Sequence, residues 1–304
     1  MTEPVMSELE FLVEILNKHP TESLKRISES EGVSYYRLKR LYDKYYGQYV
    51  QVNAMYRIEK IGLKSYIAFL SVPRSELRSV AAQIHKNPFM VDQIAMFGFK
   101  NGINSILHIP KDQVKYIDEM LSRYSEDYEY YEITRYPPTK KKEFGEWMYS
   151  YDYAVLMDIL KWDARTPLKE ISQMLGKTRP TIRYMINKLK EDGVLRGFIA
   201  TIDMDAHDRG VLGITSRLDE AVLERFKDYE IVVGVLDGDK YLLEWFFNSK
   251  EDLGTRLFEF SSYVEKVAIE YSDLLMEFNK TPRFRRFSQM IKEDGSGYRS
   301  IVEV

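Results

Sequence analysis

The chain has 304 residues and a formal net charge of −3, and its charged content of 30% is ordinary for a soluble globular protein. It has no cysteine, which excludes disulfide frameworks, thiolate metal sites and cysteine nucleophiles. No apolar run reaches the roughly 18 residues that a membrane span needs, and the first residues lack the pattern of a secretory signal. We therefore expect a cytoplasmic protein without membrane association and with room for more than one domain.

Residues 1–60 have the pattern of a winged helix-turn-helix module. Apolar spacing predicts three helices, and Gly32 can form the tight turn between the last two. Ser34 stands where a residue would cap the third helix. The predicted helices span 8–17, 23–30 and about 34–46, and an alternating strand follows at 48–56.

Residues 61–136 have a different pattern, which predicts the β-α-β-β-α-β order of a ferredoxin-like domain. The predicted strands are 65–72, 89–97, 103–109 and 127–135, and the predicted helices are 74–86 and 111–123. Residues 137–150 then combine two prolines with Lys140, Lys141 and Lys142, which is typical of an exposed linker.

The same two patterns return in the second half. A winged helix-turn-helix is predicted over 151–205, in which Gly176 forms the turn and Thr178 caps the last helix. Pro180 falls in the first turn of that helix, where its missing N–H costs nothing. The predicted elements are helices 153–160, 168–175 and 178–191 with a strand at 194–202, then a ferredoxin-like domain over 206–279 (211–218, 219–228, 231–236, 241–247, 251–260 and 264–275), and a basic, partly mobile tail over 280–304.

The two halves look like copies of one unit. Residues 13–44 align without a gap with residues 157–188, at the fixed offset of 171 − 27 = 144. Identical residues such as Ile27 and Ile171 recur at this offset with helical spacing. We therefore predict an α+β fold in which two winged helix-turn-helix modules alternate with two βαββαβ ferredoxin-like domains. One polypeptide would then form a pseudo-dimer.

This layout resembles the Lrp/AsnC family of leucine-responsive regulators. The stretch AVLMDILKWDARTPLKEISQMLGKTRPTIRYMINKLKEDGVLRGFIATID looks like the DNA-binding module of that family, and VVGVLDGDKYLLEWFFNSKEDL resembles its ligand domain. The resemblance is strong over about 150–275 and weaker over about 8–136. It implies a transcription regulator whose partner is double-stranded DNA, with no cofactor, with control by a small amino-acid-like effector as an option, and with self-association of the pseudo-dimers left open.

The third helix of each helix-turn-helix is the predicted recognition helix, which would enter the major groove. Arginine and lysine suit phosphates and guanine edges, and asparagine suits adenine. The outward residues predicted to contact DNA are Lys177, Thr178, Arg179, Thr181, Arg183, Tyr184, Asn187 and Lys188 in the second copy, and Tyr36, Arg37, Arg40 and Lys44 in the first. The alternative is that both helices carry ordinary solvated faces, or that the exposed tyrosines of the first copy contact a protein.

Two further stretches combine basic and aromatic residues. They are Lys140–Lys142 in the linker and Arg283–Phe287 in the tail, and both could follow the phosphate backbone beside the recognition helices. The alternative is a solubilising linker and a tail that docks on the other copy. The pattern alone leaves both interpretations open.

A Gly-Asp turn in the second half marks the predicted effector site. Gly238, Asp239 and Tyr241 match the motif near which the family binds effectors. Glycine lets the backbone approach a ligand closely, and a carboxylate could hold an amino group. The alternative is that these residues only form a tight hairpin. The first copy has Gly98 and Gly102 but no acid in this place, so two equivalent effector sites are not expected.

Signals of an enzyme are few, and we predict neither catalytic residues nor a metal site. The four histidines His19, His85, His108 and His207 are scattered, without metal-binding spacing, and no phosphate loop or nucleophile motif is present. One alternative is a siroheme decarboxylase, because those enzymes share the paired layout and use histidine and arginine around a tetrapyrrole. His108 and His207 are then the candidates. A non-specific chromatin or scaffold protein is a third alternative.

Overall fold

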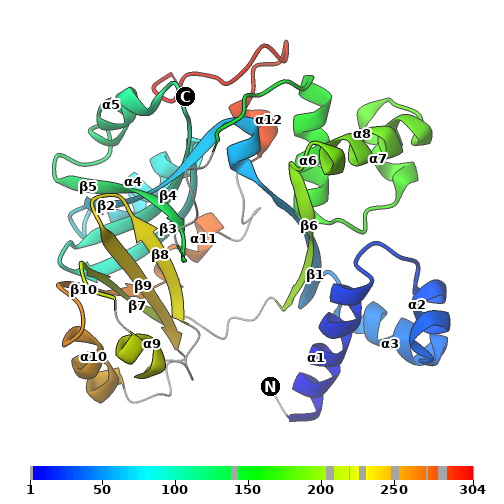
Figure 1. Ribbon diagram of the computed structural model, residues 1–304, viewed down its shortest axis with the longest axis horizontal. Helices are drawn as coiled ribbons and strands as arrows, with labels where there is room; N and C mark the ends of the chain where they lie inside the picture. Colours follow the sequence, from blue (N-terminus) through cyan, green and yellow to red (C-terminus); the bar gives the residue numbers. More distant parts are fainter. Residues whose placement is uncertain are drawn as a thin grey trace. The chain divides into compact units, whose positions relative to one another are not determined.

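The computed structural model describes residues 3–137, 143–202, 209–218, 220–225, 231–247, 253–271, 273–279 and 286–303. The first half forms α1 (Glu3–Lys18), α2 (Leu24–Glu31), α3 (Tyr35–Tyr45), β1 (Val50–Tyr56), β2 (Leu63–Ser71), α4 (Leu77–Lys86), β3 (Met90–Gly98), β4 (Gly102–Pro110), α5 (Ile117–Leu121) and β5 (Tyr128–Arg135) (Figure 1). The second half forms α6 (Tyr151–Trp162), α7 (Leu168–Leu175), α8 (Arg179–Glu191), β6 (Leu195–Ile202), β7 (Arg209–Thr215), α9 (Glu220–Arg225), β8 (Ile231–Leu236), β9 (Lys240–Phe247), α10 (Leu253–Ser261) and β10 (Lys266–Tyr271), followed by α11 (Met276–Asn279) and α12 (Phe287–Met290). Up to β10 this order of helices and strands is the one that the apolar patterns predict, and the short helices α11 and α12 are additional.

Two compact units divide the chain, and neither unit corresponds to one half of the sequence. The first unit holds both helix-turn-helix modules and is built from residues 1–61, 147–204 and 286–297. The second holds both βαββαβ segments and is built from residues 62–146, 205–285 and 298–304. Like parts of the two copies therefore fold together, and a single copy is not a folding unit.

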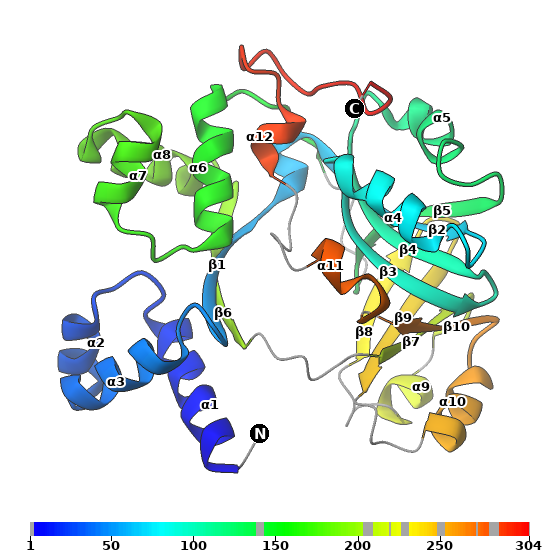
Figure 2. The same ribbon diagram turned by 180° about the vertical axis from the view of Figure 1, so that it is seen from behind.

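The second unit is a closed barrel of eight strands in the order β10-β3-β4-β2-β5-β8-β9-β7. Each half contributes four neighbouring strands, which are β3-β4-β2-β5 in the first half and β8-β9-β7-β10 in the second. Since β7 to β10 correspond to β2 to β5, the two copies have the same internal order. The sheets join where β5 pairs with β8 and where β10 pairs with β3 (Figure 2). Closure pairs both edges of each sheet, which removes the unpaired backbone groups that an open sheet exposes. The α+β fold with paired domains is confirmed.

Alternation along the strands separates the interior of the barrel from its outer face. The interior cluster draws on strands of both halves and consists of Ile67, Phe69, Met96, Leu212, Ile214, Leu236, Leu242 and Ala268. Outside, Val211, Leu243 and Trp245 pack against Val222 of α9 and Phe260 of α10. The helices therefore cover the outer face of the second sheet, while the two sheets cover each other's inner faces.

In the first unit, β1 and β6 form a two-stranded antiparallel ribbon. The ribbon runs from Val50 opposite Ile202 to Tyr56 opposite Leu195. Because the strands run in opposite directions, each helix-turn-helix lies at the end of the ribbon where its own strand begins (Figure 1). The wing of each module is thus paired with the wing of the other.

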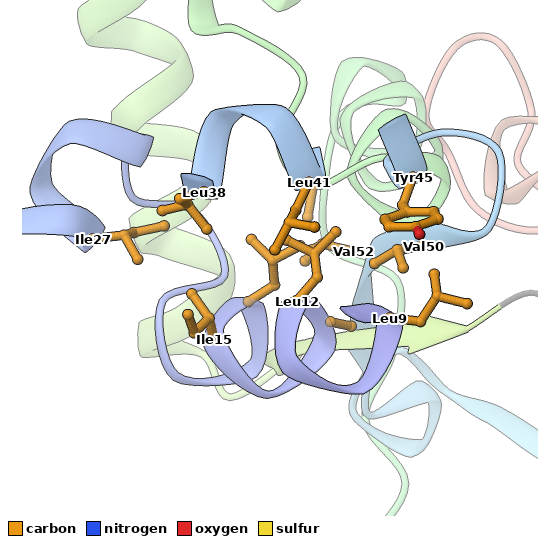
Figure 3. Packing of buried hydrophobic residues seen from close by; sticks show 12 residues of the cluster. Leu9, Leu12, Ile15, Ile27, Leu38, Leu41, Tyr45, Val50 and Val52 are labelled. Carbon is orange, nitrogen blue, oxygen red and sulfur yellow. The ribbon is translucent and has the colours of Figure 1, made fainter. Parts of the chain in front are cut away.

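The first helix of each module packs on the strand of the other module. The Asn17 side chain in α1 accepts a hydrogen bond from the Ala200 N–H at 2.8 Å and donates one to the Ala200 carbonyl at 3.3 Å. In the reverse direction, Asn53 on β1 donates to the carbonyl of Lys161 in α6 at 2.8 Å. The core of the first module, which Figure 3 shows around Leu12 and Leu41, accordingly includes Ala200 from the second half.

Arg165, which precedes α7, joins the second module to the first. Its guanidinium donates to the carbonyl oxygens of His19, Pro20 and Glu22 at 3.3, 2.9 and 2.6 Å and lies over the ring of Tyr42. These carbonyls belong to the connection between α1 and α2, outside both helices. A planar fork of N–H donors satisfies several of them at once.

Replacing Arg165 by Ala is expected to destabilise the first unit by about 2 kcal/mol, because several charge-assisted hydrogen bonds are lost together. Arg165→Lys keeps the charge but not the fork, and should recover only a small part of this loss. Thermal unfolding combined with hydrogen exchange of α2 measures the effect. Equal exchange rates in all three proteins would show that Arg165 does not join the modules.

The C-terminal segment corrects the prediction of a partly mobile tail. In the described residues 286–303, Phe287, Met290, Ile291 and Ile301 are buried. The Asp158 carboxylate in α6 accepts hydrogen bonds from the backbone N–H groups of Phe287 and Ser288, which start α12. The segment looks polar in sequence, but a few well-spaced apolar residues find partners that only the tertiary structure supplies.

Candidate nucleic-acid interface

The turn between α7 and α8 follows the predicted pattern. Gly176 has a φ of 61°, in the left-handed region that favours glycine. The Ser172 hydroxyl donates to the Lys177 carbonyl and holds the turn. Thr178 caps α8, its hydroxyl accepting from the Thr181 N–H at 3.3 Å. Local residues therefore fix the direction in which α8 leaves the turn.

The first copy repeats this turn with one difference. Gly32 has a φ of 65°, and the Ser28 hydroxyl donates to the Val33 carbonyl at 2.6 Å, as its counterpart does in the second copy. Ser34 occupies the position before α3, but its side chain makes no capping hydrogen bond. The predicted Ser34 cap is therefore wrong in that detail, and only the backbone carbonyl of Ser34 accepts, from Leu38.

The helix α8 buries one face and exposes the other. Ile182, Met185 and Leu189 are buried, as their spacing predicts. On the opposite side the structure exposes Lys177, Thr178, Arg179, Thr181, Arg183, Tyr184 and Asn187, and leaves Lys188 partly exposed. The structure therefore brings all eight residues that the sequence proposed for DNA contact to the surface of the second module.

The cations around α8 differ in whether a carboxylate already holds them. Lys177 contacts Asp152 at 2.9 Å, and Lys188 contacts Asp192 at 2.8 Å. Within the part of the chain that the structure describes, Arg179 and Arg183 form no ion pair, although both are exposed. An incoming phosphate or base edge therefore meets these two arginines without competition from a described carboxylate.

The helix α3 also has a buried and an exposed face. Leu38, Leu41 and Tyr45 are buried. The proposed contact residues Tyr36, Arg37, Arg40 and Lys44 are all exposed. Sequence reasoning missed Glu8 on α1, whose carboxylate contacts two of these cations. Its only sequence signal is that the fixed offset of 144 places an acid, Asp152, at the matching position of the second copy.

The Gly-Asp turn joins β8 to β9 as a tight hairpin. Gly238 and Asp239 have φ values of 75° and 56°, both in the left-handed region, and both are exposed. The adjacent Asp237 fixes the turn to β5, accepting from the Glu132 N–H at 2.8 Å. Tyr241 is partly buried, with its ring centroid 6.2 Å from that of Tyr136. The hairpin geometry accounts for all three predicted effector residues, and an effector role stays a prediction.

A cavity of about 860 Å³ lies at the corresponding hairpin of the first copy. It is lined by the segments 71–76, 99–101 and 122–127. Its mostly buried cation, Lys100, is neutralised by Asp127 at 2.5 Å. The charge of Lys100 in this cavity therefore already has a partner.

The remaining candidate residues separate into three groups. Lys140, Lys141, Lys142, His207 and residues 283–285 lie outside the described residues. Arg286 is exposed, but Phe287 is buried against Tyr56, so the docking alternative describes Phe287, and a phosphate-backbone role of this stretch stays a prediction. His19 contacts Glu31 at 2.7 Å, while His85 and His108 are partly buried in the second unit. Among the described residues, no group of three or more histidine, cysteine, aspartate or glutamate side chains is placed to hold a metal ion.

Comparison with known proteins places the second module in a family. Residues 151–196 match the family of winged helix-turn-helix DNA-binding domains. The HTH-type transcriptional regulator LrpA of Pyrococcus abyssi is 32% identical over 85 residues, which are 26% of this chain and 59% of that protein. The HTH-type transcriptional regulator FL11 of Pyrococcus horikoshii is 43% identical over 51 residues, which are 17% of this chain and 34% of that protein. The matches thus span about a third to three-fifths of these relatives.

Solved structures with a similar fold cover nearly the whole chain. The siroheme decarboxylase NirDL superposes with a TM-score of 0.62 at 14% identity, over 91% of this chain and 99% of that chain. Its complex with an iron-uroporphyrin III analogue gives a TM-score of 0.59 at 15% identity, over 87% of this chain and 90% of that chain. At such identity the likeness concerns the fold alone. In the described part of the chain, no helix is both long and apolar enough to cross a membrane. Residues 151–196 are thus a winged helix-turn-helix DNA-binding domain, and the chain has Lrp-family regulators among its homologues.

Proposed function

We propose that this chain is a transcription regulator that binds double-stranded DNA in a sequence-specific way through α8. The observation that carries the proposal is the pair of exposed arginines Arg179 and Arg183 on the outer face of a recognition helix, where neither forms an ion pair with any residue that the structure describes. Arginine pairs with guanine edges or phosphates in two-pronged geometry, and Asn187 on the same face suits adenine. The regulators LrpA and FL11 support this assignment for the module that they resemble.

The ribbon of β1 and β6 gives the proposal its geometry. It holds the two modules in one unit without a second chain, as a dimer interface would. We propose two DNA half-sites separated by about one helical turn or a multiple of it. Because the two recognition helices differ in sequence, the half-sites need not be identical.

Selection of bound fragments from random double-stranded DNA tests this proposal. The expected result is an enriched motif of a few base pairs that Arg183→Ala abolishes or relaxes. Footprinting of the same fragments locates the module on the site. Binding that is equal for all sequences, with no enriched motif, would favour a non-specific chromatin protein and would contradict the proposal.

We also propose that the hairpin at Gly238, Asp239 and Tyr241 senses a small effector. Asp239 is exposed and has a backbone conformation that an aspartate tolerates. A rise in the unfolding temperature with individual amino acids, lost in Asp239→Asn, would support an effector here. For the siroheme decarboxylase alternative, the support is limited to the likeness in fold, and of its two candidate residues only His108 lies in the described chain.

A further inference from the structure

A carboxylate of α1 contacts two cations on the exposed face of the first recognition helix. Glu8 on α1 lies 3.0 Å from Lys44 Nζ and 3.7 Å from a guanidinium nitrogen of Arg40. The Tyr45 hydroxyl donates to the same carboxylate at 2.6 Å. This hydrogen bond, followed by that from Lys44, holds the pKa of Glu8 below its usual range, so the carboxylate stays ionised.

The other cations of α3 also have partners within the module. The Arg37 guanidinium lies 4.8 Å from the centre of the Phe11 ring. Lys39 contacts Asp43 one turn further along the helix, at 2.6 Å. All four cations of α3 are therefore engaged before DNA arrives.

The second module places the matching acid elsewhere. Asp152, which corresponds to Glu8 at the offset of 144, contacts Lys177 in the turn and no cation of α8. Arg179 and Arg183 keep their charges unpaired among the described residues. The two modules share a fold, but only in the first does a carboxylate of the module's first helix hold two cations of the recognition helix.

Phosphate binding by α3 would have to displace an anion that is already in place. A carboxylate left beside a phosphate repels it. Each cation that stays paired with the carboxylate also fails to release a counterion from the DNA, and the affinity loses that contribution. The exposed ion pairs of Glu8 are individually weak. Their effect on DNA binding arises because one negative carboxylate contacts two neighbouring cations, Arg40 and Lys44, that would otherwise be available to phosphates.

We propose that Glu8 withholds the first recognition helix from DNA, so that the protein reads one half-site specifically through α8 and engages the other half-site weakly. This inference rests on the proposed DNA-binding function. It assigns to Glu8 the role of setting the difference between the two half-sites.

Glu8→Gln tests the inference, because the amide keeps an acceptor for Tyr45 but removes the charge. Affinity for the selected DNA should rise about fivefold or more, and the salt dependence should steepen by about 0.9 for each cation released. The footprint should extend over the half-site of the first module. Asp152→Asn removes the same charge from the matching position and frees Lys177, so it is the matched control. It should not extend the footprint.

A double-mutant cycle with Arg40→Ala separates released contacts from a general change of charge. In the wild-type background Arg40→Ala should change affinity by less than about twofold, because Arg40 is withheld. In the Glu8→Gln background it should remove a clear part of the gained affinity, while the released Lys44 keeps the rest. Circular dichroism establishes that each variant keeps its helices, and Tyr45→Phe shows the effect of losing the hydroxyl alone.

Two results would overturn the inference. One is a wild-type footprint that covers two half-sites equally, and the other is a Glu8→Gln protein that binds and protects DNA as Asp152→Asn does. Failure of the proposed function has a different signature, since Arg183→Ala would then bind like the wild type. A protein that depends on Arg183 but not on the state of Glu8 keeps the proposed function and loses this inference.

Discussion

Raising the pH from 5 to 9 is expected to lower the free energy of unfolding of the barrel, and Glu270→Gln should remove much of this dependence. Glu270 on β10 is buried, with 1% of its surface exposed. One carboxyl oxygen accepts from the Asn104 side chain at 2.5 Å. The other is buried without a hydrogen-bond partner among the described residues. Glu244 on β9 is a second carboxyl close enough to interact with it.

Burial raises the pKa of both groups. For Glu270 burial and the negative charge of Asp92 outweigh the Asn104 hydrogen bond and raise the pKa to about 7. For Glu244 burial, with repulsion from Glu270 and Asp92, raises the pKa to about 8. Burial without a compensating cation disfavours the ionised form, so both acids are mostly neutral below these values.

The sign of the pH effect follows from proton uptake. A carboxyl with a raised pKa in the folded state binds more protons when folded, so its contribution is complete below pH 4.5 and is lost as the pH rises through about 7 to 8. The shift of Glu270 alone corresponds to on the order of 3 kcal/mol. Because the two groups interact, their contributions do not add.

The measurement is urea unfolding of the wild type and of Glu270→Gln at several pH values. The two proteins should be similar at pH 5, and the variant should become the more stable one toward pH 9. His19 has a pKa raised by its hydrogen bonds with Glu31 and Glu22 and also loses stabilisation as the pH rises, but it is common to both proteins. Glu10→Gln, at an exposed position, is the control. Parallel curves for wild type and Glu270→Gln would show that the buried carboxyl is not neutral.

The second large effect concerns DNA. Replacing Arg179 and Arg183 together by Ala should weaken binding to the selected site about 30-fold or more, because a base contact of arginine is worth about 1–3 kcal/mol and two such contacts are lost. The two side chains are exposed and form no ion pair among the described residues, so the folded state should lose little stability.

Fluorescence anisotropy at several salt concentrations measures the affinity for DNA and the electrostatic contribution to that affinity. The slope of log affinity against log salt should become shallower by about one for each lost phosphate contact. Lys39, which stands at the position of Arg183 in the first copy, provides a contrast within the fold. Lys39→Ala should have little effect, because Asp43 already holds that cation. A double variant that binds like the wild type at all salt concentrations would exclude α8 as the main contact.

Much of the candidate interface was predictable because its signals are local. Gly176, Thr178 and the apolar spacing of α8 act within one turn or one helix, so the sequence alone indicates which face is exposed. The charges on that face were predictable for the same reason. Their partners were not, because Glu8 and Lys44 are 36 residues apart, and only the packing of α1 on α3 brings them together.

The buried carboxyls illustrate the same division in the barrel. Glu244 and Glu270 are single acids in largely apolar strands, and in an open antiparallel sheet a charged residue usually marks the solvent-facing side. Closure of the barrel turns that side inward. An alternating strand therefore determines that two faces exist, but the partner sheet decides which face meets water.

The sequence by itself determined the order of the helices and strands, the duplication, and the recognition helices with their exposed residues. These follow from periodicity and capping, which depend on neighbours in the chain. The tertiary structure decided the pairing of β1 with β6, the closure of the barrel, the docking of residues 286–303 and the contact of Glu8 with Lys44 and Arg40. Each of these joins segments that are distant in sequence, and the choice of partner depends on burial and charge complementarity that no local pattern encodes.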